Sequence, residues 1–196
     1  DKRSAALFRE LGQRLNEYPG VASASVSRIP LLRNTNSISN MTVEGFDASP
    51  DTNTASSLNV VGPRFFETLS IPLLAGRSFT RQDTEGRPKV AIVNRAFAEK
   101  FELGDTVVGK RMARTTGSDV ELDIEIVGLV GDARYSTIKD DPPPQFFLPI
   151  GQMPGLGSVV FYARSKGEPD AIMRAVPPLV AEFDPNLPVE NLTTLE

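Results

Sequence analysis

The sequence predicts an α+β fold in which a ferredoxin-like two-layer part carries a small β-rich insertion. A helical pattern precedes a strand pattern near the start of the chain, and a strand pattern precedes a helical one near its end. These two ends match two related β-α-β halves of a ferredoxin-like sandwich. Short apolar and alternating segments dominate the middle. We expect residues 1–71 and 156–196 to form the two-layer subdomain and residues 72–155 to form the inserted α/β subdomain.

The first third of the chain is expected to hold a long helix, several strands and a short helix. Apolar residues recur at helical spacing over residues 7–15, Ser4 is the expected N-cap, and Tyr18-Pro19-Gly20 ends the helix. Residues 21–26 alternate small apolar residues with serine, which indicates a half-buried strand. The following elements are a polar loop at 33–37, strands at 39–43 and 57–61, and a short helix carrying Phe65, Phe66 and Leu69 after Gly62-Pro63.

The middle of the chain is predicted to be rich in strands. Residues 90–93 form a short buried strand, and Asn94 is placed to cap a helix with Phe97 and Phe101 on one face. A turn-rich connection at residues 104–109 leads to a strand that alternates over residues 120–126 and stays apolar to residue 130. Three consecutive prolines require an extended loop at residues 142–144, and an apolar strand follows at 146–148.

The last third repeats the pattern of the first in a different order. Residues 159–163 indicate a strand, and Gly167-Glu168-Pro169 begins a helix. Pro177-Pro178 lies inside that helix, so a kink or two short helices are expected there, because proline removes a helical hydrogen bond. Asp184-Pro185 ends the helix, and a final strand is predicted near Val189.

Composition excludes several classes of function. The 196 residues are 40% hydrophobic and 23% charged, as in an ordinary globular protein. A net charge of −4 offers no basic surface, so nucleic acid is not an expected partner. The chain has no cysteine and no histidine, which excludes thiolate and imidazole metal sites, cysteine nucleophiles and triads with a histidine base. We therefore expect no enzyme activity, no cofactor, and no catalytic or metal-binding residue.

Residues 104–111 have the spacing of a phosphate-binding loop, with Gly104, Gly109 and Lys110 in the required positions. The next residue is Arg111, where such a loop needs Ser or Thr to hold magnesium. The segment also follows a predicted helix, whereas a phosphate-binding loop follows a strand. A turn into a strand is the better interpretation.

Glycines and acidic pairs elsewhere are also interpreted as structural. Gly128 and Gly131 are too closely spaced for a dinucleotide fingerprint, and they indicate a bulge or close packing. Asp123 and Glu125 are expected on the solvent side of the strand whose other face is Leu122, Ile124 and Ile126. Neither this pair nor Asp140-Asp141 has the ligand spacing of a calcium loop.

No segment approaches the roughly 18–20 consecutive apolar residues that cross a bilayer, and no signal-peptide pattern is present at the start. The chain also opens on Asp1 without a start methionine. These features suggest an excised piece, such as a soluble domain cut from a membrane protein.

A series of short phrases in a fixed order carries a family resemblance. They are FFETLSIPLLAGRSF at residues 65–79 with Asp83 four residues later, VAIVN at 90–94, FAEKF at 97–101, Gly104, VGKR at 108–111 and IVGLVGD at 126–132. Together they resemble the periplasmic core domain of MacB-type ABC transporter permeases (the MacB/FtsX-like permease family), in particular its long, duplicated branch. The resemblance extends over nearly the whole chain.

The resemblance implies a mechanical role. Such a domain lies between the first two transmembrane helices of an inner-membrane permease, on the periplasmic side, and divides into a porter-like subdomain and an inserted α/β subdomain. A cytoplasmic ABC ATPase would drive the permease helices, and this domain would transmit the motion. It would contact a twin permease domain, a periplasmic adaptor or the substrate during efflux or export. The family has no catalytic residues to carry over.

Two other functions stay open from the residues alone. A secreted or periplasmic ligand-binding module with a ferredoxin-like core would show an apolar pocket with a few convergent polar groups. A hydrolase that uses only carboxylates would lose its turnover on substitution of one Asp or Glu.

Overall fold

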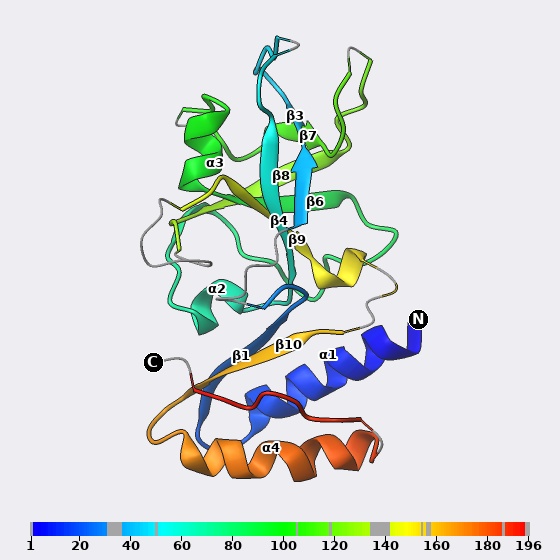
Figure 1. Cartoon of the computed structure of the whole chain (residues 1–196), viewed down its shortest axis with the longest axis vertical. Coiled ribbons are helices and arrows are strands. Elements are labelled where there is room, and N and C mark those ends of the chain that lie inside the picture. Colours follow the sequence, from blue (N-terminus) through cyan, green and yellow to red (C-terminus); the bar gives the residue numbers. More distant parts are fainter. Residues whose placement is uncertain are drawn as a thin grey trace.

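A mixed β-sheet runs through the molecule, with helices packed on it at several levels (Figure 1). The structure is a computed structural model that describes residues 2–30, 37–49, 51–104, 106–117, 119–133, 142–153, 155, 158–185 and 187–194. Its elements are α1 (Lys2–Glu17), β1 (Val21–Ser27), β2 (Ser37–Asn40), β3 (Thr42–Val43), β4 (Ala55–Val61), α2 (Phe65–Thr68), β5 (Leu73–Gly76), β6 (Lys89–Asn94), α3 (Arg95–Lys100), β7 (Arg111–Ala113), β8 (Ile124–Val130), β9 (Gln145–Pro149), the 3-10 helix η1 (Ile150–Gln152), β10 (Val160–Ser165) and α4 (Asp170–Phe183). The predicted α+β class is confirmed.

The strands follow the order β10-β1-β4-β9-β6-β8-β7-β3, with β2 added to β4 and β5 added to β8. The pairs β4/β9 and β6/β8 are parallel, whereas the other pairs are antiparallel. Parallel neighbours need a crossover connection, so segments distant in sequence are brought together here. The order could not be read from consecutive strands.

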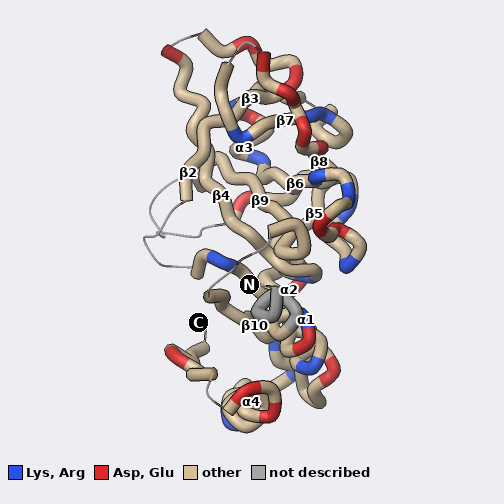
Figure 2. The backbone as a smooth tube through the Cα atoms, turned by 90° about the vertical axis from the view of Figure 1, so that its right-hand side faces the viewer, with Lys and Arg blue, Asp and Glu red and all other residues tan. Residues whose placement is uncertain are grey.

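At one end of the long axis, α1 and α4 cover one face of the ribbon formed by β1 and β10 (Figures 1 and 2). The helical spacing of Leu11 and Leu15 on α1, and of Ile172 and Val180 on α4, brings these side chains into one apolar cluster with Val21 and Ala24. This arrangement is the two-layer packing of helices on strands that the pattern at both ends of the chain predicts.

The ribbon joins the rest of the sheet through a narrow seam. One residue pair, Ser27 with Val61, links β1 to β4. Two backbone hydrogen bonds flank this pair, one from the Arg28 N–H to the Val60 carbonyl and one from the Gly62 N–H to the Val26 carbonyl, both 2.8 Å. The helical layer is therefore joined to the upper sheet by few ladder bonds.

The upper part has a core on each face of the sheet. Successive side chains of β9 point to opposite faces, so Phe146 packs with Phe97 of α3 while Phe147 packs with Phe66 of α2. Continuous apolar strands such as β6 and β9 are buried on both faces, as their sequences predict.

Asn94 performs the predicted capping role and a second role besides. Its Oδ1 accepts hydrogen bonds from the N–H of Phe97 at 3.0 Å and of Gln145 at 2.8 Å. Its Nδ2 donates to the Pro143 carbonyl at 3.0 Å. One side chain thus begins α3 and holds the proline-rich loop where it enters β9.

Gly128 lies at the bulge and close approach that the sequence predicts. The β6/β8 register shifts between Ala91 and Ile92, so that Val127 of β8 is left unpaired. A Cβ on Gly128 would lie 2.5 Å from the Arg77 carbonyl oxygen. Gly76 ends β5 with a φ of 73°. Strand β5 itself was not predicted.

Other sequence predictions need correction at helix and strand ends. Helix α1 begins at Lys2, so Ser4 lies inside it and is not its N-cap. The predicted strand at residues 39–43 is divided at Met41 into β2 and β3, which pair with different strands. The alternating pattern over residues 120–126 becomes a strand only from Ile124, where β6 and β7 supply partners. The polar loop at 33–37 lies outside the described residues except for Ser37.

Two predictions for the last third are wrong. Helix α4 is continuous through Pro177 and Pro178, so of the two alternatives the division into two short helices is wrong, whereas the kink stays a prediction. Both prolines are exposed, so water can bind the carbonyls that lose their partners while Ile172 and Val180 stay packed. No strand occurs near Val189 in the described residues 187–194. Val189 and Leu192 are about two-fifths exposed there, and Pro188 lacks a ladder donor.

The surface carries both signs of charge. Basic and acidic residues are interspersed along the molecule in the side view (Figure 2). None of the helices in the described part of the chain has both the length and the apolar character that a membrane span needs.

Candidate functional site

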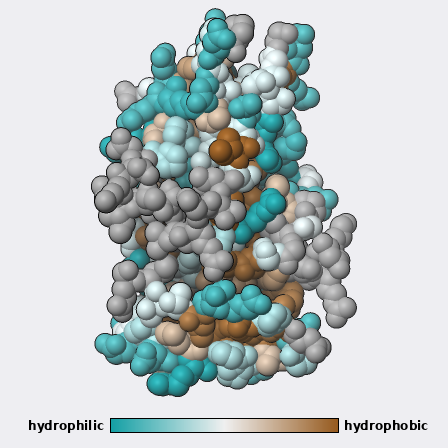
Figure 3. Space-filling view, in the orientation of Figure 1, coloured by the Kyte–Doolittle hydropathy of each residue, from teal (hydrophilic) through white to brown (hydrophobic). Residues whose placement is uncertain are grey.

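A cleft of about 560 Å³ opens where the helical layer meets the upper part of the molecule. Helix α1, strand β1 and residues 62–64 line one side, and the 80–85 loop and residues 149–153 line the other. At this level Figure 3 shows apolar residues exposed around β10, between more polar surfaces above and below.

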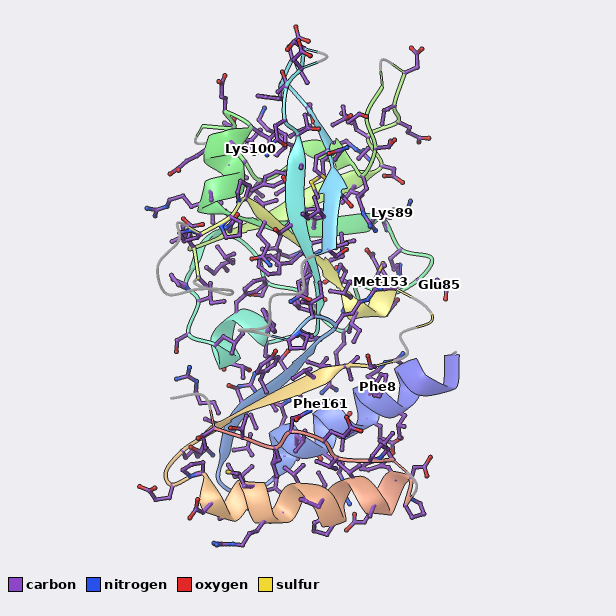
Figure 4. The ribbon with its side chains drawn as sticks, viewed as in Figure 1. Phe8, Glu85, Lys89, Lys100, Met153 and Phe161 are labelled. Atoms are coloured by element: carbon purple, nitrogen blue, oxygen red, sulfur yellow. The ribbon has the colours of Figure 1, made fainter. Side chains whose placement is uncertain are left out.

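The floor of the cleft is apolar. The buried Phe8 of α1 and the partly exposed Ile150 and Met153 line it. These three side chains belong to one apolar cluster with Val60, Val159 and Phe161, which do not themselves line the cleft. The rings of Phe8 and Phe161 meet edge to face with their centres 6.3 Å apart. Figure 4 shows Phe8 below and Met153 above, on opposite sides of this region.

Asn16 joins α1 to the neighbouring strand. Its Nδ2 donates to the Ala24 carbonyl at 2.7 Å, and its Oδ1 accepts from the Ala24 N–H at 2.9 Å. The same Nδ2 also donates to the Gly12 carbonyl within the helix at 2.8 Å. The amide therefore replaces a strand partner for β1 and leaves no free donor of its own.

Arg64 extends this connection to the upper part. Its guanidinium donates to Asn16 Oδ1 at 2.6 Å, to the Ala22 carbonyl at 3.1 Å and to both carboxylate oxygens of Glu67 at 2.9 and 2.6 Å. The hydrogen bonds between the Arg64 guanidinium and the Glu67 carboxylate raise the pKa of Arg64 and lower the pKa of Glu67. Arg64 has a φ of 63°, an unusual value for a residue other than glycine. Its strained backbone is held where helix, strand and α2 meet.

Asp83 organises the loop on the other side of the cleft. Its side chain is only 8% exposed. The carboxylate accepts two hydrogen bonds of 2.9 Å from Arg77, one of 2.7 Å from the Thr80 N–H and one of 3.2 Å from the Thr80 hydroxyl. Burial alone would raise the pKa of Asp83, but the bonds from Arg77 and Thr80 outweigh it and hold that pKa below its ordinary value.

The loop is also held by η1 and touches α1. The Glu85 N–H donates to the Gly151 carbonyl at 2.9 Å, and Gln152 bridges the Pro88 carbonyl and the Val90 N–H. Across the cleft, Arg81 Nη1 donates to Gln13 Oε1 at 3.5 Å. The two sides of the cleft are therefore each held in place by their own hydrogen bonds. Among the described residues, the long bond from Arg81 to Gln13 is the only side-chain hydrogen bond that crosses the space between them.

The motifs weighed in the sequence lie away from this cleft. Gly109-Lys110 forms a turn into β7, as interpreted, and not the start of a helix. Glu125 is exposed on β8, and Asp123 pairs with Lys89 at the surface. Asp140-Asp141 lies outside the described residues. No group of three or more acidic, His or Cys side chains in the described part of the chain is placed to hold a metal ion.

Sequence reasoning missed the residues that shape the cleft. Asn16 and Arg64 are 48 positions apart, and nothing local distinguishes either from an ordinary surface residue. Asp83 was noted only as part of the family pattern. A local signal existed in Gly62-Pro63, which stops β4 and positions the Arg64 backbone, but it does not reveal the partner.

The model of the MacB-like periplasmic core domain matches residues 4–179 of the chain. This chain belongs to that family. The predicted resemblance to the MacB-type periplasmic core domain is thereby confirmed, and the chain is an extracytoplasmic domain of a MacB-like ABC transporter permease. Its assignment to the long, duplicated branch of the family stays a prediction. No curated protein sequence matches the chain.

Solved structures show the same fold at low sequence identity. The periplasmic region of MacB from Actinobacillus actinomycetemcomitans is 14% identical, with a TM-score of 0.59 over 89% of this core domain and 73% of that chain. The extracellular domain of the ABC-type transporter YknZ from Gram-positive bacteria is 14% identical, with a TM-score of 0.55 over 90% and 81%. A domain of a putative permease from Porphyromonas gingivalis is 21% identical, with a TM-score of 0.54 over 85% and 66%.

Between pH 2.5 and 8, the stability of this core domain should depend on pH only under acid conditions. Asp83 and Glu67 have lowered pKa values in the folded state, so their contribution is complete above the unfolded carboxylate pKa of about 4 and is lost as pH falls through the folded values. The chain has no histidine to titrate near neutrality. Urea unfolding between pH 2.5 and 8 should therefore give a flat midpoint above about pH 5 and a decline below about pH 4. A step near pH 6.5 would contradict this assignment.

Proposed function

We propose that this core domain is a non-catalytic coupling domain that transmits ATP-driven motion from the permease helices to partners in the periplasm. The observation that carries the proposal is the ribbon of β1 and β10, whose two faces belong to different packing layers. On β10, Phe161 packs toward Phe8 of α1, while Tyr162 packs against Phe65 of α2, with the centres of their two rings 5.9 Å apart. A displacement of the helical layer would therefore act directly on the upper core.

The polar contacts support the same role. The ribbon shares only one ladder pair with β4, so most of the connection lies in side chains. Arg64 ties Asn16 of α1 and the β1 backbone to Glu67 of α2. On β10, Arg164 donates to the Thr68 carbonyl at the end of α2 at 2.9 Å. These bonds would make the two parts move together and not slide past each other.

The partners and the division of the chain belong to this proposal. Residues 1–71 and 156–196 would form the porter-like subdomain, with β4 and α2 reaching into the upper part, and residues 72–155 would form the inserted subdomain. The chain would be anchored to the inner membrane through the permease's own transmembrane helices and driven through them by a cytoplasmic ABC ATPase. A twin permease domain, a periplasmic adaptor or the substrate would contact its outer surface. The exposed apolar residues Leu73 and Leu74 on edge strand β5, together with the exposed Val108 beside Gly76 at the end of that strand, offer one such contact surface.

A distance measurement in the assembled transporter tests the proposal. Because this chain has no cysteine, Thr116→Cys places one spin label on an exposed site in the upper part of each permease copy, once cysteines elsewhere in the permease are replaced. Adding ATP should shift the distance between the two labels. Arg64→Ala should reduce the coupling between ATP binding and this shift by at least about fivefold, with ATP hydrolysis retained.

Arg95→Ala is the matched control, since Arg95 is an exposed arginine on α3 and does not cross between the layers. It should leave the ATP-dependent shift intact. Labels that do not move when ATP binds to the otherwise unmodified transporter would contradict the proposal, as would a full shift in a folded Arg64→Ala variant.

A further inference from the structure

The cleft presents unpaired positive charge above an apolar floor. Five charged residues line it, of which Arg64 is bound to Glu67 and Asp83 to Arg77. The other three, Arg9, Arg81 and Glu85, have no ion-pair partner among the described residues. Among the described residues, two guanidinium groups and one carboxylate at the cleft therefore form no ion pair.

The two free arginines lie on the same edge of the cleft. Arg9 precedes Gln13 by one turn of α1, so both side chains lie on one face of the helix. Arg81 reaches the same Gln13 from the opposite loop at 3.5 Å. Figure 4 shows Glu85 at the outer side of its loop, away from Phe8. The positive charge is thus concentrated near α1.

The remaining polar groups of α1 at the cleft are already occupied. Asn16 uses its oxygen for Ala24 and Arg64 and its nitrogen for Gly12 and Ala24. Gln13 donates to Glu17 at 2.9 Å and accepts from Arg81. Arg9 and Arg81 are therefore the strongest donors available to a molecule in this space, and they select an acceptor that carries negative charge.

We propose that the cleft binds a small amphipathic anion, with an alkyl body on the floor formed by Phe8, Ile150 and Met153 and a carboxylate or phosphate headgroup on Arg9 and Arg81. The volume of about 560 Å³ is within the range of roughly 300–1,000 Å³ typical of small-molecule sites. An alkyl chain removes exposed apolar surface from water, and a guanidinium fork binds either headgroup through paired N–H groups. Ligand binding in this cleft goes beyond the proposed coupling function, and it does not depend on that function.

Binding to the 196-residue chain tests the site with four twelve-carbon probes, each kept below its critical micelle concentration. Laurate and dodecyl phosphate carry the two anionic headgroups, and dodecyl maltoside and dodecyltrimethylammonium supply neutral and cationic ones. Calorimetric titration should show saturable one-to-one binding of at least one anion and weaker binding of the other two probes. The ranking of laurate against dodecyl phosphate identifies the headgroup.

Variants decide whether the arginines are responsible. The double variant Arg9→Gln/Arg81→Gln should bind the preferred anion about tenfold more weakly, since two charge-assisted bonds are lost. Arg95→Gln/Arg174→Gln removes the same charge from two other exposed sites and should bind as the unmodified chain does. Amide NMR shifts should be largest around Gly12, Arg81 and Gly151.

Three results would overturn the proposal. One is the absence of saturable binding for both anions. Another is equal affinity of the two double variants, which would mean that only net charge matters. The third is a set of NMR shifts centred elsewhere, for instance on Leu73 and Leu74. The coupling experiment with Arg64→Ala is read separately, so either proposal can fail alone.

Discussion

Gly76→Ala is expected to lower the free energy of unfolding by about 2–5 kcal/mol. Two causes add. The backbone of Gly76 has a φ of 73°, which an L side chain adopts only with strain. A Cβ there would also lie 2.2 Å from the Val127 carbonyl oxygen, so the chain must move where β5 meets the bulged part of β8.

Urea unfolding followed by circular dichroism measures this effect, and Gly86→Ala is its matched control. Gly86 has a similar φ of 82°, but nothing lies within 4 Å of a Cβ at that site. Its substitution should cost only the backbone strain, about 1–2 kcal/mol. Equal losses in the two variants would show that the close approach of β5 to β8 contributes nothing.

Asp83→Ala is expected to destabilise the protein by about 2–3 kcal/mol. The substitution removes the acceptor of four hydrogen bonds and leaves the Thr80 N–H and the Arg77 guanidinium without their partner. The loss stays below that of a fully buried ion pair, because the Arg77 side chain is 46% exposed and water can bind it. The 80–85 loop should become more mobile as well.

The same unfolding measurement applies, with Asp123→Ala as the control. Asp123 pairs with Lys89 at the surface, where both side chains are more than a third exposed. Its removal should change stability by less than about 1 kcal/mol. Hydrogen exchange should speed up at the backbone amides of residues 80–85 in Asp83→Ala only. A loss as small as that of the control would contradict the organising role of Asp83.

The solved relatives share this fold at low sequence identity. The TM-scores exceed 0.5 at 14–21% identity, so the architecture tolerates extensive replacement of side chains. Apolar positions need only keep their period and approximate volume to maintain a sheet with helices packed on it. Positions such as Gly76 and Gly128 are different, because a neighbouring backbone occupies the space of their side chains.

Local signals account for the predictions that the structure confirms. Asn94 caps α3 because its amide lies three residues before the N–H that it binds. The Gly109-Lys110 turn and the proline-rich entry to β9 likewise depend on the backbone preferences of adjacent residues. Helix α4 shows the limit of such signals, because Pro177 and Pro178 oppose the helix locally, whereas Ile172 and Val180 are held by packing against the α1–β1 layer.

Strand partners lie beyond any local signal. The segment around Val189 has the composition of a strand but finds no partner, whereas residues 73–76 form β5 because β8 offers an open edge beside them. Pairing depends on what folding brings alongside, and a short apolar segment carries no record of it.

From the sequence alone came the α+β class, the family, the capped helix after β6 and the absence of histidine and cysteine chemistry. Each depends on composition, on residue order or on neighbours a few positions apart. The cleft was decided only by the tertiary structure. The roles of Asn16, Arg64 and Asp83 arise only when α1, β1 and the 80–85 loop are brought together. A hydrogen bond over 48 positions, and a cleft floor formed by Phe8, Ile150 and Met153, exist only in the folded chain.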